Sequence, residues 1–458
     1  MTLDVTDIQG NILRGYRIHY ARHFALGVAD PAGAARLIGL LASGNEQAAP
    51  QVTTAAEWKE RPKYFLNVGI TWAGLERLGL PAPLLQLFPE PFRQGPAARA
   101  GKLGDKGDAA PENWILGGPG TPAVHLILSL YTDQQRTSER DALTAQLRAL
   151  FAANGVTEIS VHDATALPAG KVHFGYRDGI AQPRIKGTPG RAARPDMQPE
   201  CDPGEFLLGK DYINQFGGNF LGDLPNVLGD NGTYSAFRIM RQDVAGFEAF
   251  LTGAADHYGF DREMVAAKLL GRWRNGVPLM LSPDTPEPDP PLPEERLNEF
   301  DYAPSERHRA FYDDRVGLRC PVGSHVRRLN PRSAVVMGKP HSRRIIRRGV
   351  AYGPAYDPAA PDSTERGLMG HFLCGDLAMQ FEFLLSVWVN QDLSTAGLRG
   401  TRDPMLGAQV PDGGQFVIRT ADHRDPVVLD DLPRFVITRG SVYGFIPGIG
   451  ALRFLASL

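Results

Sequence analysis

Short apolar stretches, some with alternating polar positions, are interspersed along the chain with segments in which apolar residues recur every three or four positions. The apolar and alternating stretches predict strands at 63–68 (KYFLNV), 123–131 (AVHLILSLY), 434–438 and 442–446, the last two forming a pair. The helical spacing predicts helices at 72–78, 133–153, 262–273 and 380–389, and a strand followed by a helix at 235–253. This succession, with loops that suit antiparallel pairing, indicates an α+β fold.

Glycine and proline are unusually frequent, with 51 and 37 among the 458 residues. That excess predicts many turns and long ordered loops instead of long helices. Two regions stand out, because 185–235 is rich in loop-forming residues and 285–293 (TPEPDPPLP) is dense in proline. We interpret the proline-dense stretch as a surface excursion within one domain, with an interdomain linker as the alternative.

The 49 Lys and Arg residues nearly balance the 51 Asp and Glu residues, so the formal net charge is −2. A chain this close to neutral has no bulk attraction for polyphosphate, which argues against a nucleic-acid-binding role. No apolar stretch approaches the length of a membrane span, so we expect no membrane-spanning segment. The first residues, MTLDVTDIQGNILRGY, lack the basic and apolar regions of a secretory leader. We therefore expect a cytoplasmic protein, with secretion by another route as the alternative.

A histidine followed closely by two arginines stands in the segment GSHVRRLNPR, where His325 precedes Arg327 and Arg328. Guanidinium groups are costly to bury without an anionic partner, so a solvated turn is the more frequent outcome for such a segment. The alternative is an imidazole that ligates a metal beside a bound organic anion, whose carboxylates pair with the arginines.

A second basic cluster, HSRRIIRRG, places Arg343, Arg344, Arg347 and Arg348 on either side of two isoleucines. The isoleucine pair predicts a strand with one face turned inward. An arginine on that face would be buried and charged, which is unfavourable without a ligand. The cluster therefore indicates a bound anion or a reacting oxygen species, with a basic solvated strand as the alternative.

Asp178 lies between Gly175 and Gly179 in the segment FGYRDGIAQP, so a carboxylate is carried on tight, glycine-framed backbone. An Asp-Gly pair alone is most often a simple turn. A histidine ligand, a framed aspartate and an arginine are together the groups that peroxide chemistry needs. Iron held by one imidazole keeps its sixth position open. An acid-base group then moves a proton between the peroxide oxygens, and a fixed positive charge stabilises the departing oxygen.

The segments GYRDGIAQP, GSHVRRLNPR and IIRRGVAYG, in this order, strongly resemble the dye-decolorizing peroxidase family of haem peroxidases. The resemblance covers nearly the whole chain, with further similar segments at 7–13 (DIQGNIL), 68–81 (VGITWAGLERLGLP), 205–209 (EFLLG), 266–273 (AAKLLGRW) and 380–384 (QFEFL). The length of the chain is similar to that of the long-chain subgroup, which contains fungal and related bacterial members.

The resemblance implies two ferredoxin-like α+β domains, at 1–170 and 171–458, each an antiparallel sheet with peripheral helices. It implies one haem b per chain, held mainly by the second domain. It also implies an enzyme that reduces hydrogen peroxide and oxidises dyes, phenols or other aromatic donors in one-electron steps. The oligomeric state is left open.

By the same resemblance, His325 matches the proximal iron ligand and Asp178 matches the distal acid-base group. Arg347 is favoured over Arg348 as the distal arginine. A proximal histidine is expected to donate its second N–H to a carboxylate. The candidates for that carboxylate are Asp403, Asp430 and Asp431.

The resemblance also suggests which other side chains touch the haem. Cations for its propionates are expected from Arg332, Arg343 or Arg344, and Phe372 is expected to line the haem face. His371 is expected to be exposed, with a polar group in the access channel as the alternative.

A haem-binding or haem-handling protein without peroxidase turnover is the second hypothesis, and a haem-free binding module with this fold is a weaker third. Both haem-containing classes need His325, whereas only a peroxidase needs Asp178 together with Arg347. The presence of both residues favours the peroxidase. A carboxyl group has a lower ordinary pKa than an imidazole, about 3.9 against about 6.5. Dye turnover is therefore expected to be fastest in acid, unless burial raises the pKa of the carboxyl that carries the proton.

Overall fold

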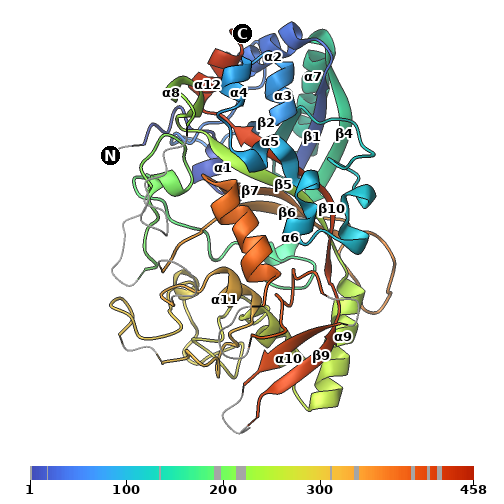
Figure 1. Ribbon diagram of the computed structural model, residues 1–458, viewed down its shortest axis with the longest axis vertical. Helices are drawn as coiled ribbons and strands as arrows, with labels where there is room; N and C mark the ends of the chain where they lie inside the picture. Colours follow the sequence, from blue (N-terminus) through green and yellow to red (C-terminus); the bar gives the residue numbers. More distant parts are fainter. Residues whose placement is uncertain are drawn as a thin grey trace.

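The computed structural model describes residues 3–17, 19–133, 136–189, 197–212, 223–309, 312–334, 340–392, 398–409, 413–419 and 425–458. Within these ranges, eight strands form one antiparallel sheet and two more strands form a separate hairpin. Helices cover the outside of the sheet, and α2 and α12, from opposite ends of the chain, lie together at the top of the view in Figure 1. The predicted α+β class is therefore confirmed.

The strands of the large sheet come from two separate parts of the chain. The first part supplies β1 (Tyr20–Val28), β2 (Tyr64–Ile70), β3 (Leu126–Thr132) and β4 (Val156–Thr165). The second part supplies β5 (Thr233–Gln242), β6 (Ile346–Tyr352), β7 (Gly367–Cys374) and β10 (Val436–Ile446). The separate hairpin consists of β8 (Gly414–Ile418) and β9 (Val427–Leu432).

The order of strands across the large sheet is β4-β1-β3-β2-β10-β5-β7-β6. Each group of four strands thus has the same order, in which the fourth strand is followed by the first, third and second, as in a pair of ferredoxin-like units. The two groups meet where Ile70 of β2 pairs with Phe445 of β10. The predicted domain boundary at residue 170 lies in the connection between β4 and β5.

The sheet curves, so that its outer strands β4 and β6 approach each other and side chains from both groups share one interior. Tyr131 of β3 and Phe237 of β5 are buried in that interior. On the other face, α2 and α7 pack over the first group with Leu37, Leu147 and Phe151 in the core. The curved sheet is therefore covered inside and outside by apolar side chains.

The helices are mostly short, as the glycine and proline content predicts. Those of the first part are α1 (Gly10–Leu13), α2 (Pro31–Leu41), α3 (Trp72–Arg77), α4 (Ala82–Leu85), α5 (Glu90–Ala98), α6 (Ala100–Leu103) and α7 (Thr137–Ala153). Those of the second part are α8 (Asn226–Gly229), α9 (Val244–Tyr258), α10 (Arg262–Leu270), α11 (His325–Leu329) and α12 (Ile449–Leu455). Single 3₁₀ turns occur at Gly107–Ala109, Pro111–Asn113, Pro168–Gly170, Pro203–Glu205 and Glu294–Arg296. Across the described ranges, every helix is too short or too polar to cross a lipid bilayer.

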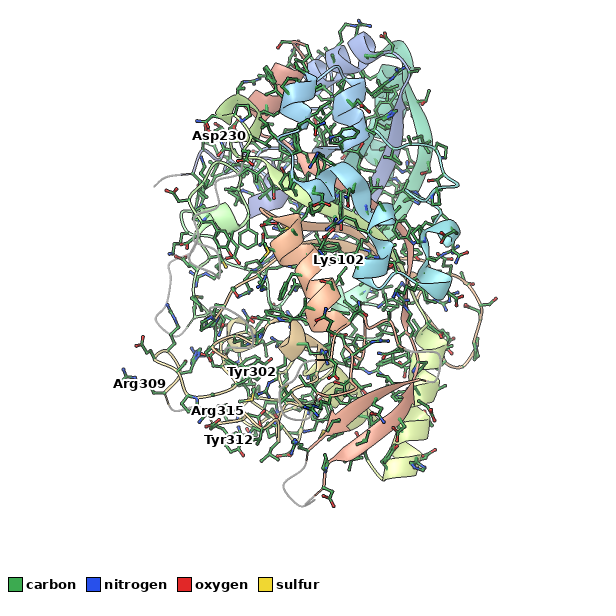
Figure 2. The ribbon with its side chains drawn as sticks, in the orientation of Figure 1. Lys102, Asp230, Tyr302, Arg309, Tyr312 and Arg315 are labelled. Carbon is green, nitrogen blue, oxygen red and sulfur yellow. The ribbon has the colours of Figure 1, made fainter. Side chains whose placement is uncertain are left out.

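A helix of π type follows β7 and is made of two consecutive segments, η6 (Leu377–Glu382) and η7 (Leu384–Val389). It runs through the centre of the view, and Lys102 lies beside it in Figure 2. The fully buried carboxylate of Glu382 accepts hydrogen bonds from Arg99 at 2.5 Å, Lys102 at 3.2 Å and the Tyr443 hydroxyl at 3.1 Å. This carboxylate ties the helix to the first part of the chain.

Most predicted elements are confirmed, with shifts of a few residues at their ends. The predicted strand 123–131 corresponds to β3, and the predicted helix 133–153 corresponds to α7. The prediction of two paired strands at 434–438 and 442–446 is wrong, because residues 436–438 and 442–446 lie on one strand, β10. The residues between them form a bulge at which β10 continues along β5. Gly440 therefore marks a bulge in one strand and not a turn between two.

Candidate active site

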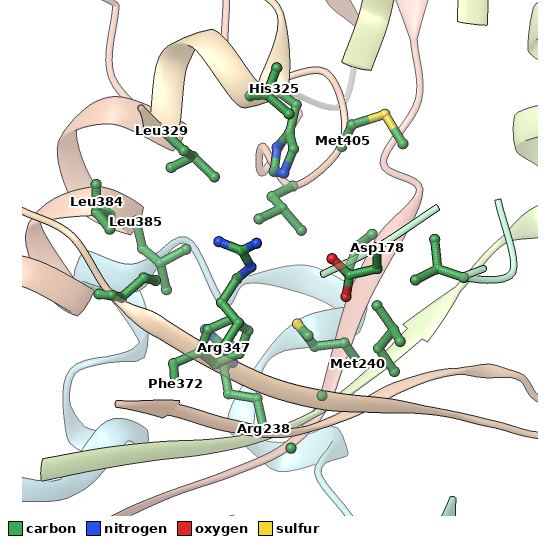
Figure 3. Close-up of a pocket in the computed structure, with 18 of the residues that line it drawn as sticks. Asp178, Arg238, Met240, His325, Leu329, Arg347, Phe372, Leu384, Leu385 and Met405 are labelled. Atoms are coloured by element: carbon green, nitrogen blue, oxygen red, sulfur yellow. The ribbon is translucent and has the colours of Figure 1, made fainter. Parts of the chain in front are cut away.

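A cavity of about 310 Å³ lies between the large sheet and the short helix α11. Figure 3 shows strands passing below this cavity, with the helix that carries His325 above it. Apolar side chains form much of its wall, including Leu329, Phe372, Leu384, Leu385 and Met405. The polar side chains that line it include those of the three candidate motifs, namely Asp178, His325 and Arg347 from distant parts of the sequence. The fold thus brings all three candidate motifs to one cavity.

His325 is the first residue of α11, and its ring is held by a buried carboxylate. Both oxygens of Asp403 lie 3.0 Å from the Nδ1 atom of His325. Because an ionised carboxylate can only accept, Nδ1 must carry a hydrogen, so in the neutral imidazole the lone pair is on Nε2. Figure 3 shows the ring pointing into the cavity. Among the described residues, no hydrogen-bond partner is found for Nε2.

Asp403 is completely buried and is itself held by its surroundings. One of its oxygens accepts the backbone N–H groups of Met405 at 2.9 Å and Leu406 at 2.8 Å. Burial alone would raise the pKa of this carboxyl, but the charge and hydrogen bond of His325, with the Leu406 N–H, hold that pKa below its ordinary value. Of the three candidate carboxylates, Asp403 is thus the one that contacts the histidine. Asp430 instead accepts a hydrogen bond from Gln415 on the β8–β9 hairpin.

The two arginines that follow His325 face away from the cavity. Arg327 is buried and donates to Asp314 at 3.0 Å and to the Cys320 carbonyl at 2.5 Å. Arg328 is also buried and donates to the Trp388 carbonyl at 2.7 Å. The prediction of a solvated turn is therefore wrong, because local carbonyl and carboxylate acceptors satisfy both guanidinium groups. These bonds fix α11 against its neighbours.

Arg347 and Arg348 are neighbours on β6 and lie on opposite faces of it. Arg347 lines the cavity, and it is paired across the ladder with Phe372 of β7, which lines the same cavity. Arg348 instead donates to the backbone carbonyls of Asn11 at 2.7 Å and Ile12 at 3.2 Å. The alternation of side chains along a strand accounts for this separation.

Asp178 is carried by the loop that leads away from β4. Gly175 and Gly179 on either side of it have φ values of 84° and 79°, which favour glycine. The Asp178 N–H donates to the Gly170 carbonyl at 2.9 Å, and its carboxylate points toward the space next to the Arg347 guanidinium in Figure 3. In the described part of the chain, no hydrogen bond or ion pair joins Asp178 to Arg347. Both groups are therefore available to a molecule between them.

Arginines are concentrated at the cavity, and two of them are buried without a carboxylate. Arg332 donates to the carbonyls of Asn298 and Phe300, both at 2.9 Å. Arg272 donates to the carbonyls of Gly276 and Leu297, and burial lowers its pKa to about 9. No anionic partner of either guanidinium is found within the described ranges. Because an uncompensated buried charge is unfavourable, this part of the cavity favours an anionic ligand.

Arg343 and Arg344 line the same cavity. Arg343 donates to the Met379 carbonyl at 2.7 Å and lies over the Phe383 ring, and burial lowers its pKa to about 10. Arg332 and Arg343 both have left-handed backbone, with φ values of 58° and 59°. Such conformations cost on the order of 1 kcal/mol or more and are concentrated at functional sites.

His371 is buried, so the prediction of an exposed residue is wrong. Its ring nitrogens lie 2.9 Å from the Ser129 hydroxyl and 2.8 Å from the Ser235 hydroxyl. His371 directly precedes Phe372 on β7, and the alternation of the strand directs its side chain into the interior shared by the two groups of strands. Burial lowers its pKa to about 4.

Three cavity residues or supports were not anticipated from the sequence. Arg238 of β5 lines the cavity and pairs with the buried Asp105 at 2.5 Å. Arg272 follows Gly271 at the end of α10, and Gln182 lies in the Asp178 loop and contacts Arg347. The alternation along β5 could have indicated the inward face of Arg238. No pattern around Gln182 signals its contact.

No family model matches the chain. The dye-decolorizing peroxidase msp1 of Mycetinis scorodonius is 29% identical to this chain over an alignment of 487 residues. The alignment covers 100% of this chain and 88% of that protein. A solved structure of a dye-decolorizing peroxidase in complex with 2,6-dimethoxyphenol has a TM-score of 0.80 at 25% identity, covering 99% of this chain and 100% of the other. A second solved structure, of a dye-decolorizing peroxidase whose heme pocket was engineered for asymmetric sulfoxidation, has the same TM-score, identity and coverage.

Over its whole length the chain is thus similar, in sequence and in fold, to proteins named dye-decolorizing peroxidases. The chain is a homologue of these peroxidases over its full length.

Proposed function

We propose that this protein is a haem peroxidase that reduces hydrogen peroxide and oxidises dyes, phenols or other aromatic donors in one-electron steps. The observation that carries the proposal is the placement of His325, backed by Asp403, at the same cavity as Asp178 and Arg347. The names of the relatives and the dimethoxyphenol in one structural neighbour support aromatic donors as the substrate class.

The cavity would hold one haem b per chain, because its lining combines an imidazole, apolar walls and buried cationic groups. The Nε2 atom of His325 would ligate the iron, and Leu329, Phe372 and Met405 would contact the porphyrin. The buried cationic groups of Arg332 and Arg343 would pair with the propionates, which supplies the anionic charge that this part of the cavity favours. The bound haem would supply a redox-active iron with one open coordination position.

The polar side chains have separate roles in this proposal. Asp178 accepts the proton from one peroxide oxygen and delivers it to the oxygen that leaves as water. Arg347 stabilises the negative charge that develops on the leaving oxygen. Asp403 accepts a hydrogen bond from the Nδ1–H group of His325, which makes Nε2 a stronger electron donor.

The test is an absorption spectrum of the purified, haem-loaded protein before and after one equivalent of hydrogen peroxide. We expect a rapid change in the haem absorption, slowed at least about 100-fold in Asp178→Asn and in Arg347→Leu, as is usual when an acid-base or charge-stabilising group is removed. Asp313→Asn and Arg315→Leu are matched controls, because these residues pair with each other on the surface. The controls should keep the wild-type rate.

Other outcomes would favour the alternative functions. A protein that binds haem but shows no change with peroxide would be a haem-binding or haem-handling protein. A protein without a haem absorption band after expression with ample haem would be a haem-free module.

A further inference from the structure

The side-chain amide of Gln182 bonds both backbone polar groups of Arg347. Its Nε2 atom donates to the Arg347 carbonyl at 3.1 Å, and its Oε1 atom accepts the Arg347 N–H at 3.1 Å. In the described part of the chain, β7 is the only strand hydrogen-bonded to β6, so the backbone groups on the other edge of β6 have no ladder partner. In an antiparallel ladder, alternate residues direct both backbone groups away from the partner strand. Gln182 therefore takes the place of a neighbouring strand at this one residue.

This contact links the backbone of Arg347 to the loop that carries Asp178. Gln182 is four residues after Asp178 in the same loop. The other side of the loop is anchored by the Asp178 N–H on the Gly170 carbonyl and by the Arg177 N–H on the Arg274 carbonyl, both at 2.9 Å. The loop is thus held on both sides of Asp178, and one anchor is the backbone of Arg347 itself.

We propose that Gln182 is a positioning residue that sets the separation between the Asp178 carboxylate and the Arg347 guanidinium during the reaction with peroxide. This inference rests on the proposed peroxidase function. Gln182 is half-buried and is not among the residues that line the cavity, so it acts through its two neighbours and not on the reacting atoms. A misplacement of about 1 Å in such a site can slow a reaction by about 100-fold.

The chain contains a matched control in Gln9. Its Nε2 atom donates to the Val68 carbonyl at 2.9 Å, and its Oε1 atom accepts the Val68 N–H at 2.9 Å. The same two-bond contact is therefore made on β2, and neither residue lines the cavity. Gln9 also donates to the Pro447 carbonyl at 2.9 Å and is completely buried, so its loss should disturb the fold at least as much as the loss of Gln182.

The experiment compares the haem-loaded wild type with Gln182→Met and Gln9→Met. Rapid mixing gives the second-order rate constant for the absorption change with peroxide, and a second mixing step gives the rate of oxidation of a phenolic donor. Amide hydrogen exchange of the peptide containing Arg347 gives a measure of the contact that does not depend on turnover. In Gln182→Met we expect the peroxide rate constant to fall about 10- to 100-fold, donor oxidation to stay within about twofold and exchange at Arg347 to accelerate.

Gln9→Met should keep the peroxide rate constant and the exchange at Arg347 within about twofold of wild type. A Gln182→Met variant with the wild-type peroxide rate would overturn the inference and leave the proposed function intact. Equal slowing in the two variants would also overturn it, since the loss would then follow from general weakening of the fold. A wild type that does not react with peroxide would remove the proposed function, and the inference with it.

Discussion

The Nδ1 atom of His325 lies at the same distance, 3.0 Å, from both carboxylate oxygens of the buried Asp403. This symmetrical contact fixes the hydrogen on Nδ1 and turns Nε2 toward the cavity. It also places a negative charge directly behind the imidazole. The electron density of Nε2 is therefore set by a residue that does not reach the cavity itself.

Replacing Asp403 by asparagine should weaken this effect while keeping an oxygen acceptor near Nδ1. We expect Asp403→Asn to raise the reduction potential of the bound haem and to lower activity with peroxide about 10- to 100-fold. A spectroelectrochemical titration measures the potential, and rapid mixing measures the rate. Asp430→Asn on β9 is the control and should leave both quantities unchanged. An unchanged potential in Asp403→Asn would show that the charge of Asp403 does not reach the iron.

Dye turnover should be fastest in acid, as is expected of an enzyme whose proton carrier is a carboxyl group and not an imidazole. The measurement is the initial rate of dye bleaching across a series of buffers from acid to mildly alkaline pH at constant ionic strength. A profile that stays flat over this range would count against Asp178 as the sole proton carrier.

Acid should also weaken the fold, because His371 is buried in its neutral form. Its pKa is lowered to about 4, so between pH 6.5 and 4 the unfolded chain binds a proton that the folded chain does not. The free energy of unfolding therefore falls as the pH falls through this window, by about 2 kcal/mol at pH 5 from this residue. Urea unfolding at pH 7 and pH 5 measures the difference.

The variant His371→Gln keeps polar atoms near Ser129 and Ser235 but cannot take up a proton. We expect it to be less stable than wild type at pH 7 and to lose less stability on acidification. His341 has its pKa lowered by burial to about 4 as well, so part of the pH dependence should remain. If the free energy of unfolding depends on pH identically in wild type and His371→Gln, His371 is not a source of the acid sensitivity.

Arg332 is buried with only carbonyl and amide oxygens as partners. Arg332→Met should weaken haem binding about 10- to 100-fold, which corresponds to the loss of one charge-assisted hydrogen bond. The haem-free form should lose little stability, since a buried cation without an anionic partner is itself unfavourable. Haem titration and urea unfolding of the haem-free protein measure the two effects, with Arg315→Met on the surface as the control. Unchanged haem affinity would show that Arg332 does not contact the propionates.

Local patterns in the sequence were sufficient for the strands β2, β3 and β5, for the helices α3, α7, α9 and α10, and for the three motifs that meet at the cavity. His325, Asp178 and Arg347 could be singled out because charged groups beside apolar or glycine-framed segments need a specific reason to be there. The sequence could not establish which face of β6 each arginine occupies, because that depends on the register with β7. The bulge in β10 was missed for a similar reason, since a glycine after a short apolar run is equally typical of a turn.

Contacts between distant segments were beyond the reach of the sequence. Asp403 could not be distinguished from Asp430 and Asp431, because only the folding of the segment after η7 brings it behind His325. The burial of His371 was missed because its serine partners lie on β3 and β5, more than 100 positions away. The Gln182 contact depends on the edge of β6 away from β7 and has no local signature.

The position of His371 between two serines has a consequence for how such a protein would be handled. If turnover improves with acidity while the fold loses stability over the same pH interval, the lowest usable pH is set by the stability of the fold and not by the chemistry at the cavity. A short assay in acid would then record a high initial rate that decays with time. A protein solution that is stored near pH 7 and diluted into acid only for the measurement would retain its full activity.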